Sequence, residues 1–333
     1  MKKFISMMCL LLTFATLFCA CNGEEPVETQ PVTESVTATA PAEETTKAPA
    51  KKNTFIDVDG TLSATSKELS FMRLRQFTNG EYLHTYAQGG IIEGDYAYTC
   101  MVTPWNRKPY ENVFRTCIVK RSLINGEIVA KSESLPLGVS NDATYVPYNN
   151  TIVVVDGLNA NNLIQILDAD TLKVKETLAL KGGVQAIAYD ELNERYITIK
   201  YDGDDKIKMY IYNKDFKLLK EISGTDGLER MDNKYGGKFN CQGIHTDGTY
   251  LYILEWHGGS KYAIDGSTIE REVETKLRIV EISTGKMVDR LDLGFQREPE
   301  YIGFRKGKFY ICTNNISWTG MELYQVSITT EKN

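Results

Sequence analysis

The sequence predicts an all-β fold in which one four-strand unit recurs around a closed ring. From Ser70 onward the chain shows almost no helical periodicity. Short alternating or β-branched runs are instead separated by Gly, Asn and Asp turns, as in chains made of short strands. The same order of strand, turn, strand and hairpin returns roughly every 40–57 residues, which is typical of a propeller blade. We therefore predict a single β-propeller.

The clearest repeat unit spans residues 240–293. NCQGIHTDGTYLYILEW indicates two strands around an Asp-Gly turn, and KLRIVEI and MVDRLDL then form a hairpin. The same layout returns in four other segments, which are residues 87–137, 141–180, 184–223 and 298–328. We thus expect five blades, each of four antiparallel strands.

The last unit has three strands before the chain ends, so its fourth strand must come from elsewhere. SFMRLRQF (residues 70–77) alternates apolar and polar residues, and we expect this N-terminal strand to complete the last blade. Closure of this kind removes the open sheet edges that a row of blades would leave. Six blades are the alternative, if residues 55–85 form more than one strand.

The N-terminus predicts export from the cytoplasm. Lys2 and Lys3 precede an apolar run that ends at Phe18, as in a secretory signal peptide. This run is shorter than the about 20 apolar residues of a membrane span. The small residue Ala20 followed by Cys21 resembles the lipobox of bacterial lipoproteins, although Phe18 stands where that family prefers leucine. The resemblance implies a signal peptide over residues 1–20, a lipid on Cys21, and a location on the extracytoplasmic face of the cell membrane. An ordinary signal peptide and a freely secreted protein are the alternative.

Residues 21–54 are predicted to be the lipidated cysteine and a disordered linker. Residues 22–52 are rich in Thr, Pro, Glu and Ala and contain no aromatic residue. Such a segment cannot bury enough apolar surface to offset the conformational entropy lost on ordering. We therefore expect the folded domain to occupy residues 55–333, held away from the membrane by this stalk.

Composition excludes some functions. The net charge of −6 is a poor match for nucleic acid, which attracts basic surfaces. We expect a monomer without a cofactor. Four cysteines follow residue 22, without CxxC or metal-ligand spacing, so we expect no metal site. They are either small buried hydrophobic residues or include a bridge between Cys100 and Cys117, which an oxidising compartment permits.

Two blade openings carry a family resemblance. They are Gln88-Gly89-Gly90 followed by Gly94-Asp95-Tyr96-Ala97-Tyr98, and Gln242-Gly243-Ile244 followed by Asp247-Gly248-Thr249-Tyr250-Leu251-Tyr252. These phrases resemble five-bladed bacterial and phage surface propellers, such as teichoic-acid-related and phage receptor-binding proteins, and more distantly propeller-type glutaminyl cyclotransferases. The resemblance implies the fold. It transfers no catalytic residue, because blade geometry alone accounts for most of the motif.

The candidate site follows from propeller geometry, because the first strand of every blade lines the central channel. The residues that start these strands form a predicted ring of amides and carboxylates at the channel mouth: Gln88, Asp142, Gln185, Gln242, Glu298 and Glu300. The loops between second and third strands open on the same face and hold all three tryptophans with polar neighbours: Trp105, Arg107, Glu255, Trp256, His257, Asn314 and Trp318. Tryptophan rings beside amides and carboxylates suit a sugar.

Each of these residues also has a structural interpretation. The tryptophans can pack between blades, the glutamines can satisfy backbone groups at blade junctions, and His257 can be an ordinary loop residue. The acidic run at residues 202–205 is interpreted as a solvated turn, because it lacks the rest of a calcium loop.

The function predicted from these patterns is a membrane-anchored binding module for a glycan or an envelope partner. No catalytic residue is assigned. One alternative is a glycan-active hydrolase or lyase that uses paired carboxylates at the channel mouth. The other alternative is a protein-docking scaffold in an envelope assembly.

Overall fold

The computed structural model describes residues 61–72, 77–79, 82–84, 86–103, 115–157, 162–203, 205–262, 268–295, 297–305, 308–314 and 321–331. Every described residue belongs to one compact unit, which spans residues 49–333. The predicted signal peptide, Cys21 and the linker therefore lie outside the described residues, as do Trp105, Arg107 and Trp318. Within the described part, no helix is long and apolar enough to cross a membrane.

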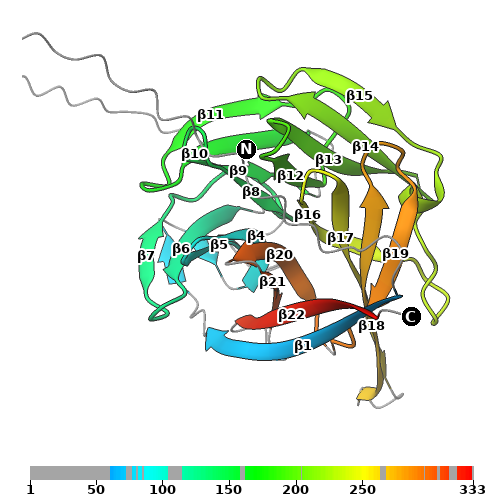
Figure 1. The fold of residues 1–333 in the computed structure, drawn as a ribbon. Helices are drawn as coiled ribbons and strands as arrows, with labels where there is room; N and C mark the ends of the chain where they lie inside the picture. Colours follow the sequence, from blue (N-terminus) through cyan, green and yellow to red (C-terminus); the bar gives the residue numbers. More distant parts are fainter. Residues whose placement is uncertain are drawn as a thin grey trace, which may run out of the picture. The chain divides into compact units, whose positions relative to one another are not determined.

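Five four-stranded antiparallel sheets form the blades of a β-propeller, as the repeat predicts (Figure 1). The first blade contains β4 (Tyr86–Glu93), β5 (Tyr96–Val102), β6 (Thr116–Ser122) and β7 (Ile128–Lys131). The second contains β8 (Ala143–Val146), β9 (Thr151–Val155), β10 (Leu163–Asp168) and β11 (Val174–Ala179). The third contains β12 (Ala186–Asp190), β13 (Arg195–Asp202), β14 (Lys206–Asn213) and β15 (Leu218–Ile222). The fourth contains β16 (Asn240–Thr246), β17 (Tyr250–Tyr262), β18 (Thr268–Glu281) and β19 (Met287–Asp292). A separate hairpin joins β2 (Phe77–Asn79) to β3 (Tyr82–His84), and a short 3-10 helix, η1 (Asp226–Leu228), precedes the fourth blade.

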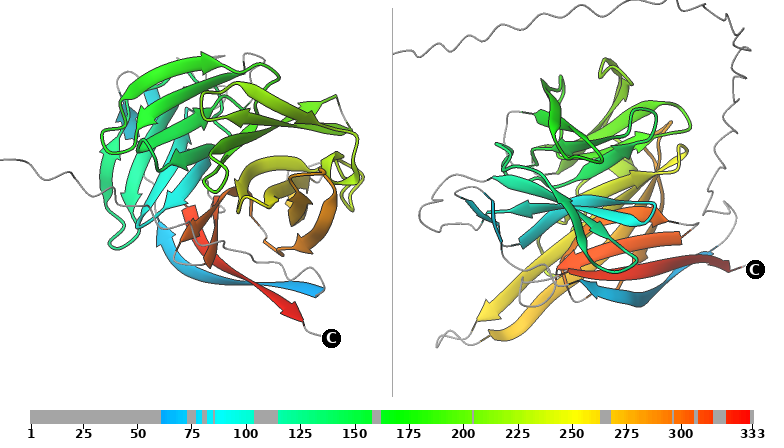
Figure 2. Two further views of the ribbon diagram at one scale, coloured as in Figure 1. Left: turned by 45° about the horizontal axis from the view of Figure 1, so that its top comes forward. Right: turned by 90° about the vertical axis from the view of Figure 1, so that its left-hand side faces the viewer.

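The fifth blade joins the two ends of the domain. It contains β20 (Pro299–Arg305), β21 (Lys308–Asn314), β22 (Met321–Glu331) and, as its outermost strand, β1 (Thr61–Met72). β1 and β22 lie side by side in antiparallel register, from Thr61 opposite Glu331 to Met72 opposite Met321 (Figure 1). Figure 2 shows the same pair, in blue and red, from two other sides. An N-terminal strand thus closes the ring, as predicted. The prediction that this strand spans residues 70–77 was wrong in position, because the pairing ends at Met72 and β2 begins at Phe77.

The innermost strands of the blades surround a common axis. Each of them contacts the innermost strand of the blade before it and of the blade after it, and β20 contacts β4 to complete the circuit. The ring therefore has five blades among the described residues, and the β2–β3 hairpin is too small to be a sixth.

Five buried apolar clusters hold the ring together, one between each pair of neighbouring blades. Blade strands are covered on both faces by their neighbours, so a central strand such as β9, with the sequence TIVVV, is buried throughout. The outer strand β11 is largely exposed, which is why it carries Lys, Glu and Thr. This gradient from apolar inner strands to polar outer strands accounts for the repeat that the sequence shows.

The four described cysteines are free thiols in these clusters. Cys100 packs in the cluster between the first and second blades, whereas Cys117 packs in the cluster between the fifth and first. The two side chains leave opposite faces of one sheet, since Cys100 pairs with Ile118 and Met101 with Cys117. A Cys100–Cys117 bridge therefore does not form in this fold.

Candidate functional site

A cavity of about 510 Å³ opens at the N-terminal ends of the innermost strands, where the sequence predicts a channel mouth. All five blades or the segments that enter them contribute to it. We call it the mouth cavity; its walls are Gln88, Val139, Asn141, Gly157, Val184, Gln185, Lys200, Tyr201, Asn240, Cys241, Gln242 and Glu298. Four of the predicted ring residues are among them: Gln88, Gln185, Gln242 and Glu298.

The amides of the mouth cavity differ in how they are held. Gln242 donates from Nε2 to Glu298 across the junction of the fourth and fifth blades. Gln88 donates from Nε2 to Glu300 at 3.1 Å, from the first blade to the fifth. The backbone of Gln185 continues the pairing with β13, but its amide makes no hydrogen bond with any described residue. Two amides are thus oriented in advance, and one is free for a ligand.

Gln88 and Gln242, which begin the two similar blade-opening motifs, do not occupy equivalent positions in their strands. The inner strands β4 and β16 each have a bulge near their start, in which Gly89 is the extra residue of the first blade and Gln242 the extra residue of the fourth. Gly89 has a φ of 56°, and its backbone lies against Asn141 where a Cβ would clash. The alignment of Gln88 with Gln242 is therefore offset by one residue, although both side chains reach the mouth cavity.

Two carboxyl groups of the fifth blade sit at this end of the channel. Burial raises the pKa of Glu298 to about 7, and the hydrogen bond from Gln242 opposes that shift. Glu300 is buried below the surface at 1 % exposure, and burial together with the nearby Glu298 raises its pKa well above the usual range. Asn314 donates its amide to Glu300 and to the carbonyl of Ala87, so Glu300 and Asn314 join the fifth blade to the first. Of these three residues, only Glu298 lines the cavity.

The remaining polar walls give the cavity a mixed character. Lys200 donates to Asn162 Oδ1 at 2.9 Å, Asn141 donates to the carbonyl of Cys241 at 3.0 Å, and Asn240 accepts from Arg230 at 3.1 Å. The phenol of Tyr201 accepts the backbone N–H of Cys241. A site with both amide donors and amide acceptors but few charges suits hydroxyl groups, which both donate and accept.

Asp142 lies below the cavity and not in its wall, contrary to the prediction that it faces the mouth. It is 1 % exposed, and its carboxylate accepts three backbone N–H groups, from Ala143, Ile187 and Ile244. Burial raises its pKa, and the three N–H donors act against that rise. Asp142 therefore joins three blades at the channel axis and is not available to a ligand.

Glu255 is likewise engaged within the fold. It is 3 % exposed and forms a buried ion pair with Arg278, which is itself 0 % exposed. Its other oxygen accepts from Arg290 Nε at 2.7 Å. The sequence cannot show this pairing, because Arg278 lies on the next strand, β18, and Arg290 on the strand after it, β19.

Trp256 and His257 lie beside the mouth cavity and do not line it. Trp256 is half-buried and pairs across the strands with Asn240, a wall residue, while its indole covers Gly258. His257 is half-buried, and its ring lies 5.7 Å from that of Tyr235. Trp256 therefore stands at the rim, where a ligand in the cavity would alter its environment.

Sequence reasoning missed several wall residues. Asn141 is not predicted because the neighbouring Asp142 is the stronger candidate for a polar site. Asn240 is not predicted because it begins β16 ahead of the motif that starts at Gln242. Lys200 and Tyr201 lie near the end of β13, where their sequence is typical of any strand with alternating polar and apolar residues. The only feature that could have identified them is their position in the blade. The second strand of a blade ends at the same face of the propeller at which the first strand begins. No group of three or more His, Cys, Asp or Glu side chains that could hold a metal ion occurs among the described residues.

Comparison with known proteins identifies no family: no family model matches the chain, and no curated protein does. Solved structures that resemble it include a chain of a nidogen–laminin complex (11 % identity, 80 % of this chain and 98 % of that one, TM-score 0.43). A member of the DUF4221 family from Bacteroides vulgatus is similar at 9 % identity over 81 % of this chain and 99 % of that one, with a TM-score of 0.42. BamB from Moraxella catarrhalis is similar at 10 % identity over 78 % of this chain and all of that one, with a TM-score of 0.36. Similarities at this level carry no functional argument, and the propeller assignment rests on the sheet topology.

Proposed function

We propose that this chain is a membrane-anchored, extracytoplasmic binding module whose mouth cavity holds a glycan. The observation that carries the proposal is the cavity of about 510 Å³ walled by the amides of Gln88, Asn141, Gln185, Asn240 and Gln242. A pyranose presents hydroxyl groups in several directions, and amides placed around a cavity can each meet one of them. The anchoring part of the proposal rests on the lipobox-like Ala20-Cys21 sequence and the linker that follows it.

The rigid placement of the amides supports binding. Gln88 and Gln242 are held by carboxyl groups of the fifth blade, so they lose little side-chain freedom when a ligand arrives. Val139 and Val184 add apolar surface on which the C–H face of a sugar can rest. The free amide of Gln185 supplies the adjustable contact.

Glycoside cleavage is the second candidate function, and one observation favours it. Glu298 has a pKa of about 7, the value expected of a carboxylic acid that protonates a leaving group. A hydrolase also needs an ionised carboxylate close by, and the nearest candidate, Glu300, is buried and has a raised pKa. Binding without turnover is therefore the function that the geometry supports better.

Titration with a broad panel of envelope and plant glycans tests the proposal. Fluorescence of the tryptophans would report binding, because Trp256 stands at the rim, and release of reducing ends would report cleavage in the same samples. Saturable binding without new reducing ends is the expected result. New reducing ends that disappear in Glu298→Gln would favour the hydrolase, and the absence of binding across the whole panel would contradict the glycan proposal.

A further inference from the structure

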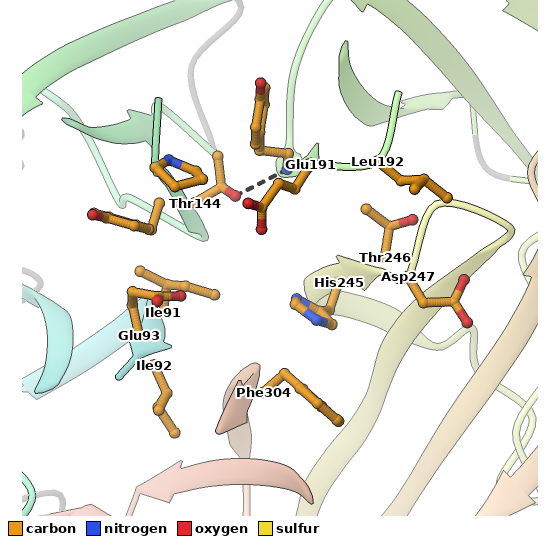
Figure 3. A pocket seen from close by; sticks show the side chains of 13 residues that line it. Ile91, Ile92, Glu93, Thr144, Glu191, Leu192, His245, Thr246, Asp247 and Phe304 are labelled. Carbon is orange, nitrogen blue, oxygen red and sulfur yellow. Dashed lines mark hydrogen bonds between the residues drawn. The ribbon is translucent and has the colours of Figure 1, made fainter. Parts of the chain in front are cut away.

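A second cavity lies at the opposite ends of the innermost strands. It has a volume of about 270 Å³ (Figure 3). Its walls come from the C-terminal ends of β4, β8, β12, β16 and β20 and from the turns that follow some of these strands. We call it the basal cavity. Its polar walls are Glu93, Thr144, Tyr145, Tyr189, Glu191, His245, Thr246 and Asp247. Three of these residues are acidic, and no lysine or arginine is among the residues that line it.

Two of the carboxylates have no counter-ion among the described residues. Glu93 ends β4, and Glu191 begins the turn after β12. Neither side chain makes an ion pair or a hydrogen bond with any residue that the structure describes. Both side chains are exposed at the opening of the cavity. Partial burial and then the charge of Glu191 raise the pKa of Glu93 to about 7, as expected for two carboxylates that face each other across the cavity. A positive charge placed between them would relieve that repulsion.

Asp247 behaves differently from these two glutamates. Its carboxylate already accepts the backbone N–H groups of Thr249 and Tyr250, both at 2.8 Å, and the phenol of Tyr252 at 3.1 Å. It shapes the turn between β16 and β17. The carboxylates that remain available to a ligand are therefore those of Glu93 and Glu191.

His245 is the second feature that distinguishes this cavity from a solvated acidic surface. Its imidazole makes no hydrogen bond with any described residue and packs beside the rings of Phe304 and Phe309, at 6.3 and 6.2 Å between centroids. Burial lowers its pKa to about 4, so the ring is neutral at physiological pH. Figure 3 shows Glu93, Glu191 and His245 directed toward the same space from three different blades. A neutral imidazole offers one nitrogen acceptor to an N–H donor.

The lining also indicates what kind of cation fits. No set of three His, Cys, Asp or Glu side chains among the described residues is arranged to hold a metal ion. Tyr145, Tyr189 and Phe304 instead give the cavity aromatic walls, and aromatic faces attract organic cations. The volume of about 270 Å³ lies just below the about 300–1,000 Å³ of typical ligand pockets, so the cavity suits a small ligand.

We propose that the basal cavity binds a small organic cation with a primary ammonium or guanidinium group, paired with Glu93 and Glu191 and hydrogen-bonded to His245. This ligand is chemically unlike the one proposed for the mouth cavity, which is neutral and rich in hydroxyl groups. The two ends of the channel then serve two different ligands, and neither site depends on the other.

Calorimetric titration of the protein with ethanolamine, putrescine and agmatine, and separately with calcium chloride, tests this proposal. We expect saturable binding of at least one amine or guanidine, weakened at least tenfold in both Glu93→Gln and Glu191→Gln. These glutamines keep the size of the side chain and remove only its charge. Glu176→Gln is the matched control, because Glu176 is an exposed carboxylate on β11, and binding should be unchanged in it.

His245→Phe separates the hydrogen bond from the charge. It keeps the aromatic packing against Phe304 and should weaken the binding of the preferred cation about fivefold or more, while circular dichroism and the melting temperature show that the ring of blades is intact. Binding of calcium alone, equal binding in the glutamate variants and the wild type, or no binding of any of the three organic cations would each overturn the proposal.

Discussion

Asp142, at the start of the second blade, accepts a hydrogen bond at 3.0 Å from the backbone N–H of Ile244 in the fourth blade. The same oxygen accepts from Ile187 in the third blade at 3.1 Å. A single buried carboxylate thus joins non-neighbouring blades across the channel axis. In a ring whose blades meet mainly through apolar clusters, this contact helps to fix how the inner strands lie relative to one another.

Asp142→Asn should destabilise the fold. The carboxylate offers two oxygens to three backbone N–H groups, whereas an amide offers one oxygen and one N–H₂ group. In either orientation the N–H₂ group faces a backbone N–H, which leaves at least one buried N–H unsatisfied. We expect a loss of about 2–3 kcal/mol in the free energy of unfolding, measured by urea denaturation. Asp215→Asn, in an exposed turn of the third blade, is the control. Equal stability of Asp142→Asn and the wild type would show that the axis does not need this carboxylate.

Glu255→Gln should be costly for a different reason. It leaves the guanidinium of Arg278 buried at 0 % exposure without its carboxylate partner. Breaking a buried ion pair by removing one partner costs about 3–5 kcal/mol. Urea denaturation would measure the loss, and replacing Glu255 and Arg278 together by Met and Leu should recover part of it. A Glu255→Gln variant as stable as the wild type would instead return Glu255 to the set of candidate ligand-binding residues.

The thiols of Cys100, Cys117, Cys241 and Cys312 should resist alkylation in the native protein. All four are buried and therefore shielded from the reagent, and burial also raises the pKa of Cys100, Cys241 and Cys312, so their reactive thiolate forms are scarce. Treatment with iodoacetamide followed by peptide mass mapping should find them unmodified before denaturation and fully modified after it. A Cys100–Cys117 bridge in the mapped peptides would contradict the placement of these side chains on opposite faces of the first blade.

Stability should depend on pH through Glu298. Its carboxyl keeps a proton up to about pH 7 when folded, whereas the unfolded chain releases that proton near pH 4.5. The folded state therefore binds more protons in this window, and its stability falls as the pH rises from about 4.5 to 7. Glu298→Gln cannot ionise and should lack this loss, so the variant should gain roughly 3 kcal/mol on the wild type between pH 4.5 and 8.

Thermal unfolding at a series of pH values would measure this difference. Comparison with the variant is necessary because other groups also contribute: Glu93 acts in the same direction, and His245, whose pKa is lowered to about 4, adds stability as the pH rises. Parallel pH profiles for the wild type and Glu298→Gln would contradict the raised pKa.

The sequence predicts the blades well because a blade is a local unit. Each strand, turn and hairpin in residues 240–293 is encoded by neighbouring residues, so the period and the turn signals suffice. The closing strand was misplaced by several residues, because its partner β22 lies at the other end of the chain and nothing local fixes the register.

The site was predicted only in outline for the same reason. Topology places Gln88, Gln185, Gln242 and Glu298 at one end of the channel, and this follows from knowing where first strands begin. Whether a carboxylate faces the opening or turns inward depends on which groups from other blades meet it. Asp142 points inward because its carboxylate accepts backbone N–H groups of other blades, and Glu255 points inward because it pairs with two arginines. The basal cavity has no sequence motif, since Glu93, Glu191 and His245 are brought together only by the closing of the ring.

The most direct test of the mouth cavity is calorimetric titration of Gln185→Ala with the best glycan ligand of the wild type. The amide of Gln185 makes no hydrogen bond within the described fold, so its removal should leave stability unchanged and weaken glycan binding about tenfold, the typical effect of a lost hydrogen bond in a polar site. Asn125→Ala, in an exposed turn of the first blade, should bind as the wild type does. Full affinity in a stable Gln185→Ala variant, with the same result for Gln88→Ala and Gln242→Ala, would show that the ligand binds elsewhere and would contradict the account.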